Sequence, residues 1–286
     1  MQIEPLSLAH QHLLEPKFQQ LNLPLSEYSF ANLYLFRQLH QYQVIQLNGE
    51  TFIQGLTRDK VPFIMLTSPP SLIPSPLLER ALSRAQILFP VPEDWLRLLD
   101  KWLVQASFKE EDSDYLYTTT KLAHYPGRHL SSKRNLVKQL LTHHEVRSEN
   151  VVQQLRDAQE ILENWLAEHS EMNHQADYSS CLEALEHFDR LHLHGQIVYV
   201  NQKPAGFVIG EWLGKDDYAV HFSKASRSIK GLYQYLFQKL AQSLEGTYSW
   251  INLEQDLGIP SIRYSKLSYQ PDLLVKKWRV QLHLSL

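Results

Sequence analysis

The sequence contains two similar segments spaced by about half the chain, and this internal resemblance constrains the fold more than any other feature. Residues 44–55 (VIQLNGETFIQG) have the form of a strand, an Asn-Gly turn and a second strand. Residues 197–210 (IVYVNQKPAGFVIG) repeat this form, with Asn201 at the turn and a closing glycine. Each hairpin leads into a third extended segment and then into a helical pattern. Two such copies in 286 residues indicate a duplicated domain rather than a solenoid.

The predicted boundary between the two copies lies near residue 143. Apolar residues at helical spacing predict a helix that ends there, and a new strand is expected over 145–151. We therefore expect an N-terminal domain of residues 1–143 and a C-terminal domain of residues 144–286 that carries the functional site. Each is predicted to be a mixed α/β sheet with helices on both faces, an order typical of the GNAT acyltransferase fold.

Composition indicates a globular protein of the cytoplasm. Apolar residues make up 43% and charged residues 21% of the chain, which excludes a disordered or fibrous class. The N-terminus lacks the basic flank and hydrophobic run of a signal peptide. The most apolar stretch, residues 61–76, contains five prolines and cannot form an integral membrane segment. The single cysteine, Cys181, excludes an intramolecular disulfide and fits a reducing compartment.

Charge is distributed unevenly along the sequence. Residues 121–147 contain six Lys and Arg against one acid, and residues 258–286 are also basic. Between them, residues 149–189 contain ten acids against Arg156 alone. The two basic segments are expected either to meet as an anion-binding cleft or to form ordinary solvated surfaces.

Two further stretches carry a resemblance to a known family. The first runs from Ser113 to Asn135, and the second comprises residues 221–225 and 252–271. Together they resemble the phosphatidylglycerol lysyltransferase C-terminal domain family, including its stand-alone members, over essentially the whole chain. The resemblance implies two tandem GNAT-like domains. It also implies transfer of an aminoacyl group from aminoacyl-tRNA to a lipid headgroup, as in the membrane-bound relatives. The sequence departs from the family at Ser223, where an acid is common, and at residues 260–262.

Direct acyl transfer needs a proton acceptor and stabilisation of the oxyanion, but it needs no covalent nucleophile. The chain has no Gly-x-Ser-x-Gly elbow, and Cys181 lies in an acidic stretch that offers no reason for a thiolate. Glu254 and Asp256 are two residues apart at an expected strand end, so both should project to one face as candidate catalytic groups. The alternative is that Asp256 caps the following helix. His221 is a third candidate, with a buried structural histidine as the alternative.

Basic and polar residues in both halves are candidates for binding an anionic substrate. Arg263 and Lys266 are three apart on an expected helix and should share a face. We expect Lys133 and Arg134 to face the same cleft. The complete set of predicted substrate- or anion-binding residues is Lys133, Arg134, Asn135, Lys224, Arg263, Lys266 and Tyr269.

The sequence leaves the donor and acceptor open. Residues 227–232 (RSIKGL) stand where an acyl-CoA enzyme would have a pyrophosphate-binding loop, but they contain one glycine at the wrong spacing. This favours aminoacyl-tRNA or another charged donor over acyl-CoA, and a small molecule or lipid headgroup is the expected acceptor. No metal site is expected, because the histidines lack the spacing of zinc ligands. The leading hypothesis is an acyl or aminoacyl transferase. The alternative is a catalytically idle GNAT-like protein that binds an anionic ligand, RNA or a lipid headgroup.

Overall fold

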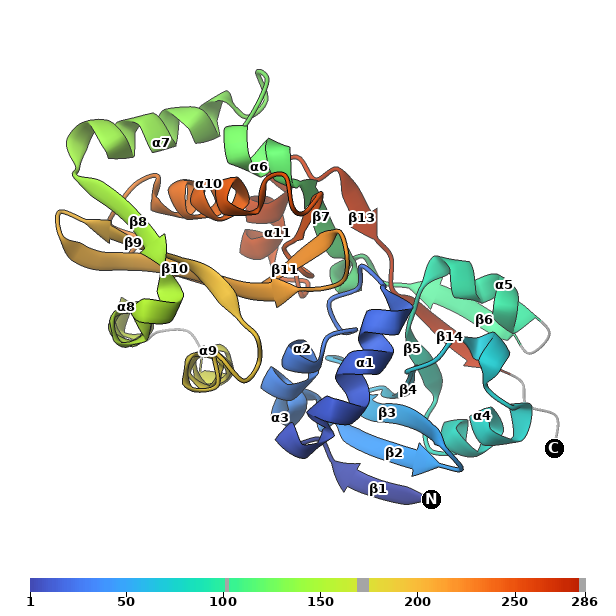
Figure 1. Ribbon diagram of the computed structural model, residues 1–286. Helices are drawn as coiled ribbons and strands as arrows, with labels where there is room; N and C mark the ends of the chain where they lie inside the picture. The colour runs from blue at the N-terminus through green and yellow to red at the C-terminus, as the bar shows by residue number, and fades with distance from the viewer. Residues whose placement is uncertain (101–102, 169–174, 283–286) are drawn as a thin grey trace. The chain divides into compact units, whose positions relative to one another are not determined.

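Two seven-stranded mixed sheets make up the fold of this computed structural model, which describes residues 1–100, 103–168 and 175–282 (Figure 1). Each sheet belongs to one of two units. Unit 1 comprises residues 1–114, 255–259 and 274–286, and unit 2 comprises residues 115–254 and 260–273. The mixed α/β class is confirmed.

Unit 1 contains the first sheet and short helices. Across the sheet, the strands are β1 (Gln2–Pro5), β2 (Gln43–Leu47), β3 (Glu50–Leu56), β4 (Pro62–Leu66), β5 (Ile87–Val91), β14 (Trp278–Leu282) and β6 (Leu103–Phe108). The helices are α1 (Gln11–Leu21), α2 (Phe30–Leu35), α3 (Arg37–His40), α4 (Ser75–Leu82) and α5 (Leu96–Leu99). Single 3₁₀ turns lie at Leu8–His10, Pro70–Leu72, Glu93–Trp95 and Glu110–Asp112. The α2 helix begins where the Ser29 hydroxyl accepts a hydrogen bond from the Asn32 N–H at 3.0 Å.

Unit 2 contains the second sheet and longer helices. Across this sheet, the strands are β8 (Val146–Asn150), β9 (His194–Val200), β10 (Lys203–Trp212), β11 (Asp217–Ala225), β12 (Trp250–Asn252), β7 (Asp114–Thr118) and β13 (Leu273–Val275). A 3₁₀ turn lies at Val151–Gln153. The helices are α6 (Thr119–His124), α7 (Ser131–His143), α8 (Leu155–Glu168), α9 (Gln175–Glu186), α10 (Leu232–Leu244) and α11 (Pro260–Leu267).

The two sheets have the same strand order, which confirms the expected pair of similar mixed sheets. In both, an antiparallel run of four strands is followed by a parallel neighbour, β5 beside β4 and β12 beside β11. The predicted hairpins are β2–β3 and β9–β10, and they occupy equivalent positions in the two sheets. Both turns have two residues with positive φ, Asn48 and Gly49 in one and Asn201 and Gln202 in the other. Such turns match the twist of the strands that they join.

The boundary between the units differs from the predicted one at residue 143. The sixth position of each sheet is filled by a strand from the other half of the sequence: β14 lies between β5 and β6, and β7 lies between β12 and β13. The chain therefore leaves unit 1 after Asp114, and α6 and α7 belong to unit 2. Helical periodicity located α7 correctly, but it carries no information about which sheet the neighbouring strand joins.

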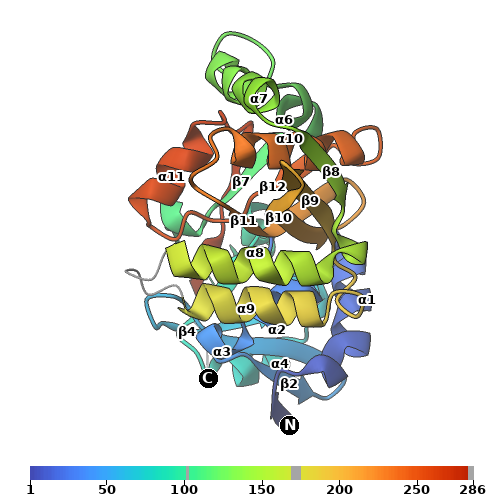
Figure 2. The same cartoon turned by 90° about the vertical axis from the view of Figure 1, so that its left-hand side faces the viewer.

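Helices cover both faces of the unit 2 sheet. On one face, α10 packs against β9, β10 and β11, and α6 and α7 pack against α10. The core beneath α10 includes Tyr117, Val208, Tyr218, Leu236 and Leu240. On the other face, α8 packs against β10 and β11, and α9 lies beside α8 (Figure 2).

Gly231 permits the close packing of α7 on α10. It has φ +87° at the residue before α10, and a Cβ atom there would lie 2.3 Å from the carbonyl oxygen of Leu136. The start of α10 is therefore in direct contact with α7. Within the parts of the chain that the structure describes, no helix combines the length and the apolarity needed to cross a bilayer.

Candidate functional site

The parallel pairing of β11 with β12 is short and leaves part of β11 beyond it. Three residue pairs are formed, ending at Ala219 and Asn252, whereas β11 continues to Ala225. A ligand-binding crevice in an α/β sheet is commonly found at the carboxyl ends of strands. The candidate site is built at this position.

A β-bulge places His221 at the end of the pairing. Ile209 of β10 opposes Phe222 of β11 and the next residue, Gly210, opposes Val220, so His221 is the extra residue. A bulge redirects a side chain and is common next to active sites. Beyond it, the Ser223 hydroxyl is buried and has no hydrogen-bond partner among the described residues. An unsatisfied buried hydroxyl is unusual and suggests a position where a ligand group can bind.

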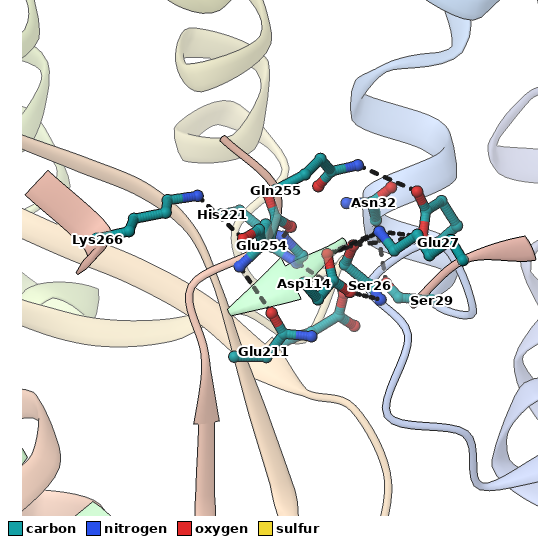
Figure 3. A network of polar contacts seen from close by, with 12 residues as sticks. Ser26, Glu27, Ser29, Asn32, Asp114, Glu211, His221, Glu254, Gln255 and Lys266 are labelled. Atoms are coloured by element: carbon teal, nitrogen blue, oxygen red, sulfur yellow. Dashed lines mark hydrogen bonds and ion pairs between the residues drawn. The ribbon is translucent and has the colours of Figure 1, made fainter. Parts of the chain in front are cut away.

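His221 lies between two carboxylates (Figure 3). Its Nδ1 is 2.8 Å from Oε1 of Glu254, and its Nε2 is 2.8 Å from Oε1 of Glu211. The imidazole is fully buried, whereas each glutamate side chain retains 13% of its exposure. Within the cluster, the two glutamate side chains are therefore the parts that reach the surface.

The electrostatics of this His221 cluster (Glu211, His221 and Glu254) fix the histidine as a cation. Burial alone lowers the pKa of His221, but the hydrogen bonds and charges of Glu211 and Glu254 outweigh it and raise the pKa from 6.5 to about 10. The imidazolium donates a hydrogen bond to each carboxylate, and with both glutamates ionised the cluster carries a net charge of −1. At neutral pH His221 holds its proton, so it positions the two carboxylates instead of accepting a proton itself.

The backbone at Glu254 is held on both sides. The Glu254 N–H donates to Oδ1 of Asn252 at 2.6 Å, and its carbonyl oxygen accepts from the Tyr115 N–H at 3.2 Å and from Nζ of Lys266 at 3.0 Å. Glu254 adopts φ +59°, an uncommon conformation for a residue with a side chain. Such strain persists only where neighbouring contacts impose it, and it is frequent at functional sites.

Asp256 does not share a face with Glu254. The left-handed turn at Glu254 interrupts the strand alternation on which that expectation rested, and Asp256 belongs to unit 1. Its buried carboxylate accepts a hydrogen bond from the Gly258 N–H at 2.8 Å, and its carbonyl oxygen accepts from Ile259 at 3.0 Å. Asp256 closes a turn that ends before α11 begins at Pro260, so these two hydrogen bonds do not make it the cap of that helix.

The predicted cations of α7 and α11 have separate partners. Lys133 donates to the Ser268 hydroxyl at 2.6 Å and lies 4.0 Å from the ring centre of Tyr269. Arg134 donates to the carbonyl oxygens of Tyr125 and Gly127. All of these residues belong to unit 2, so Lys133, Arg134 and Asn135 are not contributed by an N-terminal domain.

Three other predicted binding residues also have structural contacts. Nζ of Lys266 donates a hydrogen bond to the Glu254 carbonyl oxygen, and Tyr269 is buried in the core under α10. The Lys224 side chain is 5% exposed, forms an ion pair with Asp177 of α9 and lies 3.7 Å from the ring centre of Trp165. Arg263 is half-buried on α11.

Glu211 is not among the site residues predicted from the sequence. The available signal was an acid in the otherwise apolar run Val208–Trp212, on a strand expected to pair with the strand that carries His221. Alternation places Glu211 on the sheet face opposite Val208, which packs under α10. Its meeting with Glu254 depends on the bulge and on the turn after β12, which have no clear sequence signature.

Unit 1 contains a second buried charge cluster, of which Figure 3 labels Ser26, Glu27 and Asp114. Nζ of Lys277 lies 2.6 Å from Glu27 and 2.7 Å from Asp114, and it donates to the Ser26 hydroxyl at 3.0 Å. Asp114 accepts from the Ser26 N–H at 2.8 Å. The side chains of Lys277 and Asp114 have no exposed surface, and that of Glu27 has 8%. This Lys277 cluster (Glu27, Asp114 and Lys277) is closed to solvent.

The loop before α10 is poorly suited to a pyrophosphate. The Arg227 N–H donates to a carboxylate oxygen of Glu168 at 3.2 Å, and the Ser226 hydroxyl donates to the other at 2.9 Å. A protein carboxylate thus occupies donors that a phosphate would use. Among the described residues, no group of three or more His, Cys, Asp and Glu side chains is arranged to hold a metal ion.

A family model matches nearly the full chain, and a curated relative matches part of it. The family model described as "Phosphatidylglycerol lysyltransferase, C-terminal" matches residues 18–281. An uncharacterised protein of Mycoplasmoides gallisepticum is 23% identical over 176 residues, which cover 60% of this chain and 57% of that protein.

Solved structures share the fold. A conserved protein of unknown function from Bacteroides thetaiotaomicron has a TM-score of 0.84 at 21% identity, covering 98% of this chain and 99% of that one. A C-terminal domain assigned to a lysylphosphatidylglycerol synthetase from Agrobacterium fabrum has a TM-score of 0.66 at 14% identity, covering 96% of this chain and 93% of that one.

Proposed function

The chain belongs to the phosphatidylglycerol lysyltransferase C-terminal family, and from this premise we propose that it transfers an acyl or aminoacyl group at the His221 cluster. Homology to transferase domains supports this class of reaction. The observation that carries the proposal is a pair of partly exposed glutamates, Glu211 and Glu254, held by a buried imidazolium just beyond the point where β11 and β12 stop pairing.

In the proposed reaction, a hydroxyl or amine of the acceptor attacks the carbonyl carbon of the donor ester. The new bond forms as the bond to the donor's ester oxygen breaks. A carboxylate of the cluster takes the acceptor's proton, and that proton is returned to the leaving oxygen. The two glutamates are candidates for this step, and His221 keeps them in position.

The charge of the cluster supports an aminoacyl donor. A net charge of −1 at a partly buried site favours a ligand that carries an ammonium group, as an aminoacyl ester does. Acyl-CoA is disfavoured because Glu168 occupies the loop before α10 and α7 contacts the start of that helix. We therefore propose aminoacyl-tRNA as the donor and a small molecule or a lipid headgroup as the acceptor.

Transfer of a labelled aminoacyl group tests this proposal. Wild-type protein is incubated with aminoacyl-tRNA and candidate acceptors, and the labelled product is separated from hydrolysed amino acid. Glu254→Gln and Glu211→Gln each remove one carboxylate, and we expect the more important of the two to lower kcat at least about 100-fold, the lower range for general acid–base catalysis. Glu245→Gln, which removes the acid of an exposed His–Glu pair in the same unit, is the matched control.

A catalytically idle binding protein would give a different result. The basic segment around α7 favours this second candidate, because it supplies exposed cations for an anionic ligand. In that case the ligand would bind to all three variants and no product would form with any acceptor. Transfer at wild-type rate in both Glu211→Gln and Glu254→Gln would contradict the proposed site.

A further inference from the structure

A groove in unit 2 lies apart from the His221 cluster. It has a volume of about 350 Å³ and is lined by His124 of α6, Gln238 of α10 and one face of α7. The lining positions on α7 are 134, 137, 138, 141 and 142, which follow the spacing of a single helical stripe. The groove lies on the face of the sheet that α10 covers, and strand alternation places Glu211 of the His221 cluster on the opposite face. The groove is therefore separate from that cluster.

Several hydrogen-bond donors at the groove are uncommitted. Arg134 uses Nη1 for the carbonyl oxygens of Tyr125 and Gly127, which leaves its Nε and Nη2 donors without a partner in the described chain. The Lys138 ammonium and the Gln238 amide likewise have no hydrogen-bond partner among the residues that the structure describes. The two contacts of Nη1 also hold the guanidinium in place, so its remaining donors are oriented in advance.

The charge around the groove is positive. Residues 119–144, which include α6 and α7, contain no Asp or Glu. The acid near the groove is Glu245, which pairs with His124 at 2.9 Å and offsets that histidine when it is protonated. Arg134 and Lys138 are four residues apart on one helix, where like charges repel. Binding of an anion would relieve that repulsion.

We propose that this groove binds the phosphate group of a phosphate ester. An arginine fork and a lysine ammonium are the donors that phosphate oxygens prefer, and the Gln238 amide adds a third donor from the facing helix. Val137, which is buried, and Leu141, which is exposed, provide apolar surface for the carbon part of the ester. The ester is either a soluble metabolite or the headgroup of a phospholipid at a membrane surface.

The proposal is tested with one probe for each source. Binding of glycerol phosphate is measured by calorimetry, and binding to phosphatidylcholine vesicles with and without phosphatidic acid is measured by sedimentation. Lys138→Gln should weaken the relevant binding about tenfold, as expected for loss of one charge-assisted hydrogen bond. Gln238→Glu, which places a carboxylate in the groove, should weaken it further.

Lys203→Gln removes the same charge from the exposed β9–β10 hairpin and should leave binding within about twofold of wild type. Binding of glycerol phosphate that both groove variants lose identifies a soluble source. Binding to phosphatidic acid vesicles alone, with the same losses, identifies a lipid headgroup. The proposal is overturned if neither probe binds, or if both groove variants bind with wild-type affinity. It is also overturned if Lys203→Gln lowers the affinity as much as Lys138→Gln does.

Discussion

The two units contain a similar arrangement of charges with different access to solvent. In unit 1, Lys277 lies between Glu27 and Asp114, and in unit 2, His221 lies between Glu211 and Glu254. Both cations are fully buried. The side chains of Glu27 and Asp114 in unit 1 are 8% and 0% exposed, whereas those of Glu211 and Glu254 in unit 2 are each 13% exposed.

A buried cation between two acids does not by itself define a reaction site. A closed cluster compensates buried charge and contributes to structure, because no ligand can reach it. The pairing of β3 with β4 in unit 1 runs without a bulge, whereas β11 in unit 2 has the bulge at His221. The open cluster thus coincides with the irregularity that redirects a side chain.

The largest expected effect is on the closed cluster. Lys277→Met leaves Glu27 and Asp114 buried without their cation, and we expect a loss of about 3–5 kcal/mol in the free energy of unfolding. Burial already raises the pKa of Glu27 to about 7, and Asp114 adds to this while Lys277 opposes it. Without Lys277 the two acids are more costly to ionise, so the loss should be greater at pH 8 than at pH 5.

Urea denaturation of wild type and variant at both pH values measures this effect. Lys17→Met on α1 is the control, and it should change the free energy of unfolding by less than about 0.5 kcal/mol. If Lys277→Met lowered the free energy of unfolding by less than about 1 kcal/mol, the Lys277 cluster would not have the structural role that distinguishes it from the His221 cluster.

An effect of similar size is expected from the proton on His221. Its pKa is raised from 6.5 to about 10 in the folded protein, so the folded state binds this proton more tightly than the unfolded state. The stability that it contributes is complete below about pH 6.5 and is lost as pH rises through about 10. At about 1.4 kcal/mol for each unit of pKa, this amounts to a few kcal/mol.

His221→Gln should lack this dependence. The difference in unfolding free energy between wild type and variant is measured at pH 6 and pH 10, and we expect it to shrink with rising pH. An NMR titration of the His221 ring in the wild type gives its pKa directly. An equal pH slope in the two proteins would show that His221 is not held as an imidazolium.

The smallest effect is expected at the exposed pair of His124 and Glu245. Nε2 of His124 is 2.9 Å from Oε1 of Glu245, but the two side chains are 53% and 35% exposed. Glu245→Gln should therefore change the free energy of unfolding by less than about 0.5 kcal/mol, because solvent screens exposed pairs. Thermal unfolding of this variant checks that value. It also shows whether the larger stability effects of the two clusters come from their burial and not from ion pairing alone.

Local pattern alone determined much of the fold of this chain. Apolar alternation and the turn residues located the hairpins β2–β3 and β9–β10, and helical spacing located α7 and α10. These signals are readable because they depend on residues that are close in the sequence. His221 and Glu254 were candidates for the same reason, as polar residues beside an apolar strand.

Tertiary structure alone decided how these parts combine. The exchange of β7 and β14 between the sheets moved the boundary, because strand pairing depends on partners more than a hundred residues away. Residue spacing in the sequence could not show that Glu211 would meet Glu254 through His221. It also could not show that Asp256, two residues from Glu254, would close a turn in the other unit. The positions of Glu211 and Asp256 depend on the bulge at His221 and on the left-handed conformation of Glu254. At such residues a small change in backbone angle redirects the side chains and the chain that follow.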